Sequence, residues 1–404
     1  MNTGDTAFML IASAFVMLMT PGLALFYGGL VRSKNVLGTI MHSFICLGIV
    51  SVIWVAYGYS LAFGPDVAGL TGNLDWMWLN GVGTKAGPYS DTIPDLLFCA
   101  FQLMFAILTP ALITGGFAER MKFSAFLIFT VLWSSLIYMP VCHWVWGGGW
   151  LGSIGALDFA GGTVIHINCG FAALAAAVII GKRKGWGRES FHPHNLSMTI
   201  FGAGILWFGW FGFNAGSALT AGETAALAFF TTQVATGAAA LSWIMAEWIV
   251  RTKPTTLGAA SGAVAGLVAI TPAAGFVSPV SAVIIGLVAG VLCYSAVLLK
   301  SRLGYDDALD VLGIHGIGGI WGALATGLFA SIAVNPDGAN GLFFGNPYQF
   351  VIQAIGVGAT IAYSFIGSAI ILKIIDVTVG LRVTSEEEVQ GLDITQHSEI
   401  GYSI

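Results

Sequence analysis

The 404-residue chain is too apolar to be a water-soluble globule. Hydrophobic residues make up 56% of it and charged residues 9%, against roughly 45–50% and about 25% in soluble domains. We therefore expect a multi-pass protein of a lipid bilayer, in which apolar side chains face lipid as well as one another. The net charge of −5, with no basic cluster larger than residues 182–184, argues against nucleic-acid binding.

Apolar runs long enough to cross a bilayer predict an all-α polytopic membrane protein with eleven transmembrane helices. In chain order the runs cover 6–31, 36–63, 94–119, 121–146, 161–181, 196–216, 223–250, 256–275, 279–299, 310–331 and 348–372. The first run lacks the positive flank of a signal peptide, so we expect it to be retained. Residues 1–372 then form the membrane domain, and 373–404 form a polar cytoplasmic tail.

The basic residues predict the orientation, because Lys and Arg collect in the cytoplasmic connections of membrane proteins. Every Lys and Arg except Lys85 falls in the first, third, fifth, seventh or ninth connection or in the tail. The N-terminus is therefore expected outside and the C-terminus in the cytoplasm.

Many transporters consist of two inverted repeats. When each repeat has an odd number of spans, the second copy crosses the membrane in the opposite orientation. Here a five-plus-five repeat, over about 6–181 and 196–331, leaves 348–372 as an extra helix. Spans five and ten support this, since GGTVIHINCG contains His166 and VLGIHGIGG contains His315. The repeat places these two histidines as symmetry mates near the middle of the membrane.

His166 and His315 are the best candidates for chemistry, because an ionisable side chain at membrane depth needs a partner or a cavity. Two neutral imidazoles can hydrogen bond to each other and line an apolar path without adding charge. A lone histidine more often bonds a neighbouring carbonyl, and the pairing favours the functional interpretation. His143 has no such mate and is expected to be structural.

Aromatic residues at the outer span ends form a second candidate set: Phe101, Phe105, Trp146, Trp210 and Phe213. Most aromatics in such a chain face lipid or the core. Rings at a membrane mouth nevertheless suit a cation, since a cation-π contact avoids the desolvation of a carboxylate. Ser217, one turn beyond Phe213, adds a hydrogen-bond acceptor.

Two carboxylates near the membrane allow competing interpretations. Asp158, just before span five, is either a helix N-cap or a negative group that favours a cation nearby. Glu247 is expected to pair with Arg251 on the surface, one helical turn away. His192 and His194 lie in a cytoplasmic turn, where metal binding is not expected.

No catalytic or metal site is expected. The five cysteines are scattered and lack CxxC spacing, so neither a disulfide framework nor a zinc site is predicted. HExxH, GxSxG and GxxxxGK[ST] motifs are absent. We expect neither an enzyme nor a cofactor.

The chain closely resembles the ammonium transporters of the Amt/Mep/Rh family, and the Amt branch in particular. The resemblance covers essentially the whole sequence, through TPGLALFYGGLVRSKN, GALDFAGGTVIHI, GWFGFNAGS, DVLGIHGIGGIWG and DVTVGLRV. It implies a homotrimer in the plasma membrane, with a pore in each subunit and a PII-type regulatory protein as cytoplasmic partner. Ammonium is the implied substrate, with methylammonium as an analogue.

The resemblance also implies roles for individual residues. Trp146, Phe105 and Ser217 look like the outer ammonium site, with Asp158 beside it in a mainly structural role. Phe105 and Phe213 look like rings that close the pore, with Phe101 and Trp210 as neighbours, and His166 and His315 look like the twin histidines of the pore. Ammonium would lose its proton before ammonia crosses, with the proton following separately.

Two other functions are possible in principle. The same fold could act as an ammonium sensor that signals to cytoplasmic partners, but a tail of about thirty residues is short for a signalling domain. An unrelated membrane enzyme or an amine/proton symporter would need an acidic residue buried in mid-span, and none is apparent in the sequence.

Overall fold

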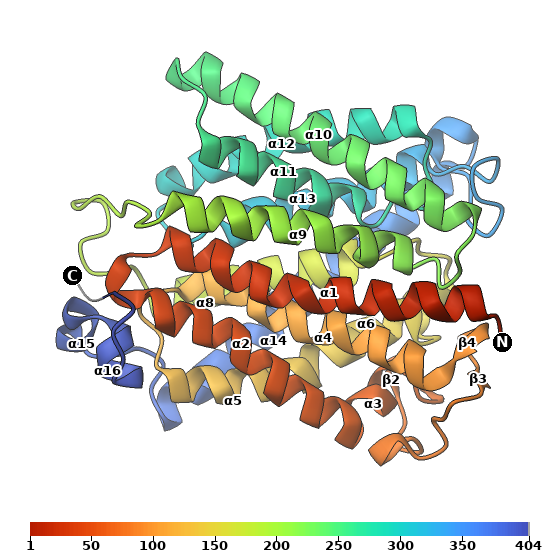
Figure 1. The fold of residues 1–404 in the computed structure, drawn as a ribbon, viewed down its shortest axis with the longest axis horizontal. Helices are drawn as coiled ribbons and strands as arrows, with labels where there is room; N and C mark the ends of the chain where they lie inside the picture. Colours follow the sequence, from red (N-terminus) through yellow and green to blue (C-terminus); the bar gives the residue numbers. More distant parts are fainter. Residues whose placement is uncertain (403–404) are drawn as a thin grey trace.

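The computed structural model describes residues 1–402 and is almost entirely helical. Ten of its helices are long and apolar enough to cross a membrane, and they lie side by side as a bundle (Figure 1). Six of these are single α-helices: α1 (Thr3–Leu30), α4 (Asp95–Phe117), α9 (Leu196–Gly216), α10 (Glu223–Arg251), α12 (Pro279–Leu303) and α14 (Pro347–Thr378). The expected multi-pass helical architecture is confirmed.

The other four long helices each contain a π-helical segment. They are η1 (Ser33–Asn35) with α2 (Val36–Ile53), η2 (Trp54–Gly58) and α3 (Tyr59–Phe63); α5 (Phe123–Trp133) with η4 (Ser134–Tyr138), α6 (Met139–Trp146) and α7 (Trp150–Ser153); η5 (Gly162–Ile167) with α8 (Asn168–Ile180); and η6 (Leu312–Gly316) with α13 (Ile317–Phe329). π-Helical turns break the regular α-helical hydrogen-bond pattern and often occur at functional sites.

The remaining elements are short. They are α11 (Thr256–Ile270), α15 (Ser385–Gln390), α16 (Leu392–His397), the 3₁₀ turns η3 (Met77–Leu79) and η7 (Leu342–Phe344), and strands β1 (Asp66–Val67), β2 (Thr71–Gly72), β3 (Ala86–Gly87) and β4 (Ser90–Pro94). The strands form two antiparallel hairpins, β1–β2 and β3–β4.

Helix α11 is shorter than the sequence predicted. The apolar run suggested a span over 256–275, but the helix ends at Ile270 after 15 residues, about 22 Å of helix. Pro272 explains the early end, because proline supplies no backbone N–H to continue the helix. The described residues therefore contain ten long apolar helices and one short one.

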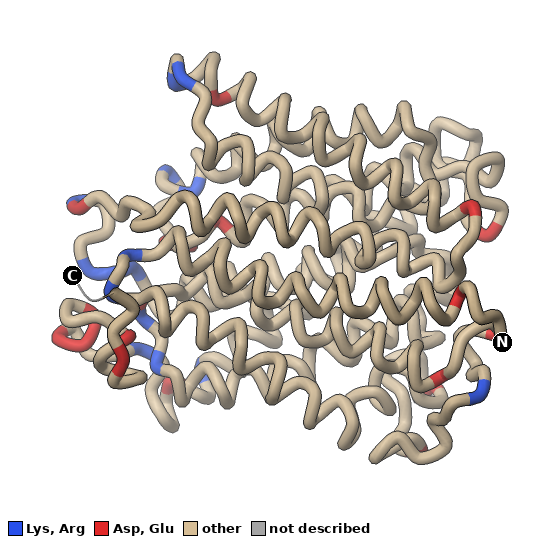
Figure 2. Tube along the Cα trace, viewed as in Figure 1, with Lys and Arg blue, Asp and Glu red and all other residues tan. Residues whose placement is uncertain are grey.

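The charged residues lie mainly at the two ends of the bundle (Figure 2). Nearly all Lys and Arg are at the end where α15 and α16 pack, which we call the tail end. The chain begins at the opposite end, which we call the N-terminal end (Figure 1). This separation is the pattern expected of a membrane protein with one cytoplasmic face.

The tail segment folds back onto the bundle. Asp393 of α16 accepts hydrogen bonds from the backbone N–H groups of Leu37 and Gly38, at 3.1 and 2.8 Å, at the start of α2. Asn35 accepts a hydrogen bond from the Leu392 N–H at 2.9 Å, and Arg382 pairs with Glu388 at 2.7 Å. The tail is thus an ordered cover over the tail end of the bundle.

A buried ion cluster lies beneath this cover. Arg183 donates to Asp306 at 2.8 Å and to Glu119 at 2.9 Å. Glu119 also accepts from Arg32 at 2.9 Å. The Glu119 and Asp306 side chains have no solvent exposure. The cluster therefore links the first, third, fifth and ninth connections of the chain.

Candidate functional site

The structure brings His166 and His315 together at the centre of the bundle. Their Nδ1 atoms are 3.2 Å apart and both side chains are buried. The ring planes are inclined by only 18°. In a pair of neutral imidazoles, one Nδ1–H donates to the other Nδ1, so the expected hydrogen bond is present.

Both histidines occupy π-helical turns, His166 in η5 and His315 in η6. Glycines allow these helices to cross closely. A Cβ added at Gly170 would lie 2.4 Å from the backbone N and Cα of Gly316. A side chain at Gly170 would therefore push the two histidine helices apart, which is why a small residue is needed at this crossing.

An aspartate lies eight residues before each histidine. Asp158 accepts four backbone N–H bonds, from Gly161, Gly162, Thr163 and Val164, at 2.7–3.2 Å. Asp307 accepts from the Leu312 N–H at 2.8 Å. Both carboxylates therefore cap the start of a π-helical turn. For Asp158, these contacts favour the capping interpretation over direct cation binding.

The sequence did not single out Asp307, although its spacing from His315 repeats that of Asp158 from His166. Burial raises the pKa of Asp307 to about 6, despite the nearby positive charge of Lys300. Asp307 Oδ1 is buried and has no hydrogen-bond partner among residues 1–402. Asp307 is thus the less fully bonded of the two caps.

A column of rings leads from the histidine pair toward the N-terminal end. His166 lies 5.4 Å from Trp210 and 6.0 Å from Phe213, in nearly parallel stacks. Phe213 contacts Phe105 with ring centroids 4.5 Å apart, and Phe101 lies 4.8 Å from Phe105. These four aromatic side chains are buried, so the rings fill the path above the histidines.

A cavity of about 290 Å³ opens above these rings. Phe105, Trp146 and Ser217, the residues that the family resemblance implies for an outer site, all line this cavity. Trp146 Nε1 donates to the backbone carbonyl of Asp158 at 2.8 Å, so Asp158 holds this ring through its main chain. Ser217 Oγ donates to the Phe213 carbonyl at 2.9 Å, which leaves its lone pairs able to accept a further bond.

Several lining residues were missed by the sequence reasoning, notably Gln102 and Phe159. Gln102 Oε1 is buried and has no partner in the described part of the chain. The sequence could have indicated Gln102, because it is a polar residue inside an apolar span and lies three positions before Phe105. None of the residues that line the cavity is charged. The cavity thus offers ring faces and neutral oxygens to a small cation.

Two other polar side chains were tested by the structure. His143 is bonded to the Ala62 carbonyl at 3.0 Å and to Asp66 at 2.9 Å, in agreement with a structural role. The expected Glu247–Arg251 pair is wrong. Glu247 is instead buried and accepts hydrogen bonds from the backbone N–H and the hydroxyl of Thr255. These bonds hold the turn that leads into α11.

Comparison with known proteins gives matches over the whole chain. A family model described as the Ammonium Transporter Family matches residues 7–402. The ammonium transporter of Bacillus subtilis is 56% identical over 403 residues, which cover 100% of this chain and 99% of the relative. Amt1 of Archaeoglobus fulgidus is 48% identical over 403 residues and 100% of both chains. These relatives are named as transporters rather than enzymes.

Solved structures agree with the sequence matches. The crystal structure of Saccharomyces cerevisiae Mep2 has a TM-score of 0.90 at 36% identity, with 96% of this chain and 88% of that chain covered. A structure named Sensor Amt Protein also has a TM-score of 0.90, at 30% identity and with 98% of both chains covered.

Proposed function

Because the chain belongs to the ammonium transporter family, we propose that it transports ammonium across the plasma membrane through a pore within each subunit. One observation carries this proposal. The histidine pair, at 3.2 Å, lies below the edge-to-face pair of Phe105 and Phe213, which in turn lies below an uncharged cavity. This order provides a place to collect a cation, a barrier to it, and an apolar path beyond.

Ammonium is recruited in the cavity. The rings of Trp146 and Phe105 attract the cation through their faces, and Ser217 accepts one of its N–H bonds. Potassium is attracted by the same rings but has no N–H to donate and no proton to lose. Asp158 contributes by holding Trp146 and the start of η5, as its contacts indicate.

Ammonium then loses a proton, because an ion cannot cross the apolar segment without a large desolvation cost. Ammonia passes Phe105 and Phe213, with Phe101 and Trp210 beside them, and then moves along His166 and His315. The proton crosses separately, so that transport is electrogenic. A reconstituted bilayer under an ammonium gradient will therefore carry a net inward current, whereas ammonia transport with no current would refute the electrogenic step.

We propose an assembly and a topology as well. The N-terminus is outside and the C-terminus cytoplasmic, which agrees with the Lys and Arg at the tail end (Figure 2). The equal Asp-to-His spacing of 158–166 and 307–315 supports the inverted repeat. The functional unit is a homotrimer, and the basic face with its folded tail is the surface for a PII-type regulatory protein.

Methylammonium uptake tests the pore assignment. In cells without their own transporters, His166→Asp will reduce uptake by about tenfold or more, because it places a charge in the neutral path. His192→Asp makes the same change at an exposed histidine and serves as the matched control. Equal uptake by the His166→Asp variant and the wild type would remove His166 from the pore.

A further inference from the structure

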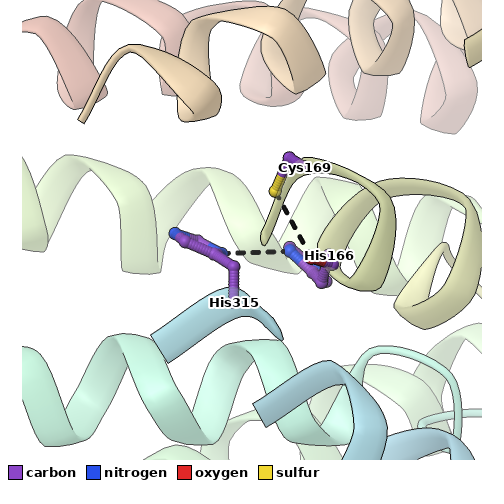
Figure 3. Close-up of side chains that lie close together, drawn as sticks. All are labelled: His166, Cys169 and His315. Atoms are coloured by element: carbon purple, nitrogen blue, oxygen red, sulfur yellow. Dashed lines mark hydrogen bonds between the residues drawn. The ribbon is translucent and has the colours of Figure 1, made fainter. Parts of the chain in front are cut away.

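A thiol joins the histidine pair at the centre of the bundle. Cys169 lies three residues beyond His166, and potential ligand atoms of Cys169, His166 and His315 all lie within 4.8 Å of one another. Figure 3 shows the three side chains converging from two helices, with Cys169 Sγ 3.5 Å from the His166 carbonyl oxygen. All three residues are buried.

The histidine pair does not use all of its nitrogens. His166 Nε2 is fully buried and has no hydrogen-bond partner within residues 1–402. Each imidazole can therefore direct one nitrogen to a metal ion after a ring rotation, with the thiol as a third ligand. This group could not be predicted from the sequence, because His315 lies 149 residues after His166 and the three residues lack the usual ligand spacing.

The donor set determines which ions fit. Two imidazole nitrogens and one thiolate favour soft metal ions such as Cu(I). Charge decides between ions in this apolar surrounding. A monovalent ion with one thiolate is neutral overall, whereas Zn²⁺ with one thiolate keeps a net positive charge that is costly to bury. We propose that His166, Cys169 and His315 form a binding site for a soft monovalent cation, Cu(I) or Ag(I).

Binding balances in both atoms and charge. The Cys169 S–H bond breaks as the metal–sulfur bond forms, and the thiol proton leaves as the monovalent ion enters. The net charge of the site is unchanged, and no oxidation or reduction occurs. The Nδ1–Nδ1 hydrogen bond gives way to two metal–nitrogen bonds. The accepting ring binds through its unprotonated Nδ1, and the donating ring rotates and binds through its unprotonated Nε2, so both imidazoles keep their protons and stay neutral.

Silver binding to the purified full-length chain tests the site. Cys169→Ser is compared with Cys293→Ser, since Cys293 is also buried but lies outside the cluster. Both variants keep four thiols, which corrects for silver bound by other cysteines. We expect Cys169→Ser to weaken the tightest silver site by at least about tenfold, and Cys293→Ser to leave it intact. Equal binding by both variants would overturn the proposal.

X-ray absorption on the silver-loaded wild type gives a result that needs no variant. A first shell of one sulfur and two nitrogens supports the site, and a shell of sulfur alone contradicts it. Both measurements are made without transport, so the site can fail while the transport function stands, and the reverse also holds. Silver will in addition inhibit methylammonium uptake more strongly in Cys293→Ser than in Cys169→Ser, each relative to its own uptake without silver.

Discussion

Arg183→Met is expected to destabilise the protein by roughly 3–5 kcal/mol, because it leaves buried carboxylates without their main cation. Arg183 forms ion pairs with both Asp306 and Glu119, whose side chains have no solvent exposure. Arg32 remains for Glu119, but no other Lys or Arg in the described residues forms an ion pair with Asp306. Methionine retains an unbranched apolar stem, and the change removes the charge of Arg183 together with its side-chain hydrogen bonds to Asp306 and Glu119.

Denaturant unfolding of the detergent-solubilised protein will measure this loss. Lys184→Met is the matched control, because Lys184 is adjacent in sequence but exposed and forms no ion pair in the described part of the chain. Its stability should differ from that of the wild type by about 0.5 kcal/mol or less. Equal stabilities for the two variants would show that the ion cluster contributes nothing.

The same cluster sets a pH dependence. Burial acts to raise the pKa of Glu119, but the charges and hydrogen bonds of Arg183 and Arg32 outweigh it and lower the pKa from 4.5 to about 2. A carboxyl group with a lowered pKa stabilises the fold fully above its unfolded pKa and loses this contribution as the pH falls from 4.5 toward 2. The free energy of unfolding of Arg183→Met should therefore fall less than that of the wild type as the pH is lowered from 4.5 toward 2.

The helices and the histidine pair could be predicted because their signals are local. Long apolar runs specify the spans, and one histidine in each of two similar spans indicated that His166 and His315 would meet. The length of α11 was predicted wrongly because the same local signal, hydropathy, does not record where a helix must end. Hydropathy continues through 271–275, while the helix ends near Pro272 for reasons of hydrogen bonding that an average over side chains does not include.

The ion cluster and the thiol at the histidines could not be predicted in this way. In the sequence, Arg183 is one of several basic residues in a predicted cytoplasmic connection, and its partners Glu119 and Asp306 are 64 and 123 residues away. Cys169 looked like one more cysteine in an apolar run. Both depend on contacts between distant segments, which the sequence pattern of one segment does not report.

Gly170→Ala is expected to lower methylammonium uptake by about tenfold or more, because it displaces the helices that hold the two histidines. The new Cβ would lie 2.4 Å from the Gly316 N and Cα, and backbone atoms cannot rotate out of the way. Overpacking of this kind costs about 1–3 kcal/mol or forces a backbone shift. Here the shift separates His166 from His315.

Gly48→Ala is the control for this change. Gly48 also lies inside a membrane helix, α2, but a Cβ there meets no atom within 4 Å. Alanine is the better helix former by about 1 kcal/mol, so this variant should fold and transport at least as well as the wild type. Uptake is scaled to the amount of folded protein measured by gel filtration. Transport by Gly170→Ala at the wild-type rate per folded chain would mean that the pore does not depend on the close crossing at Gly170 and Gly316.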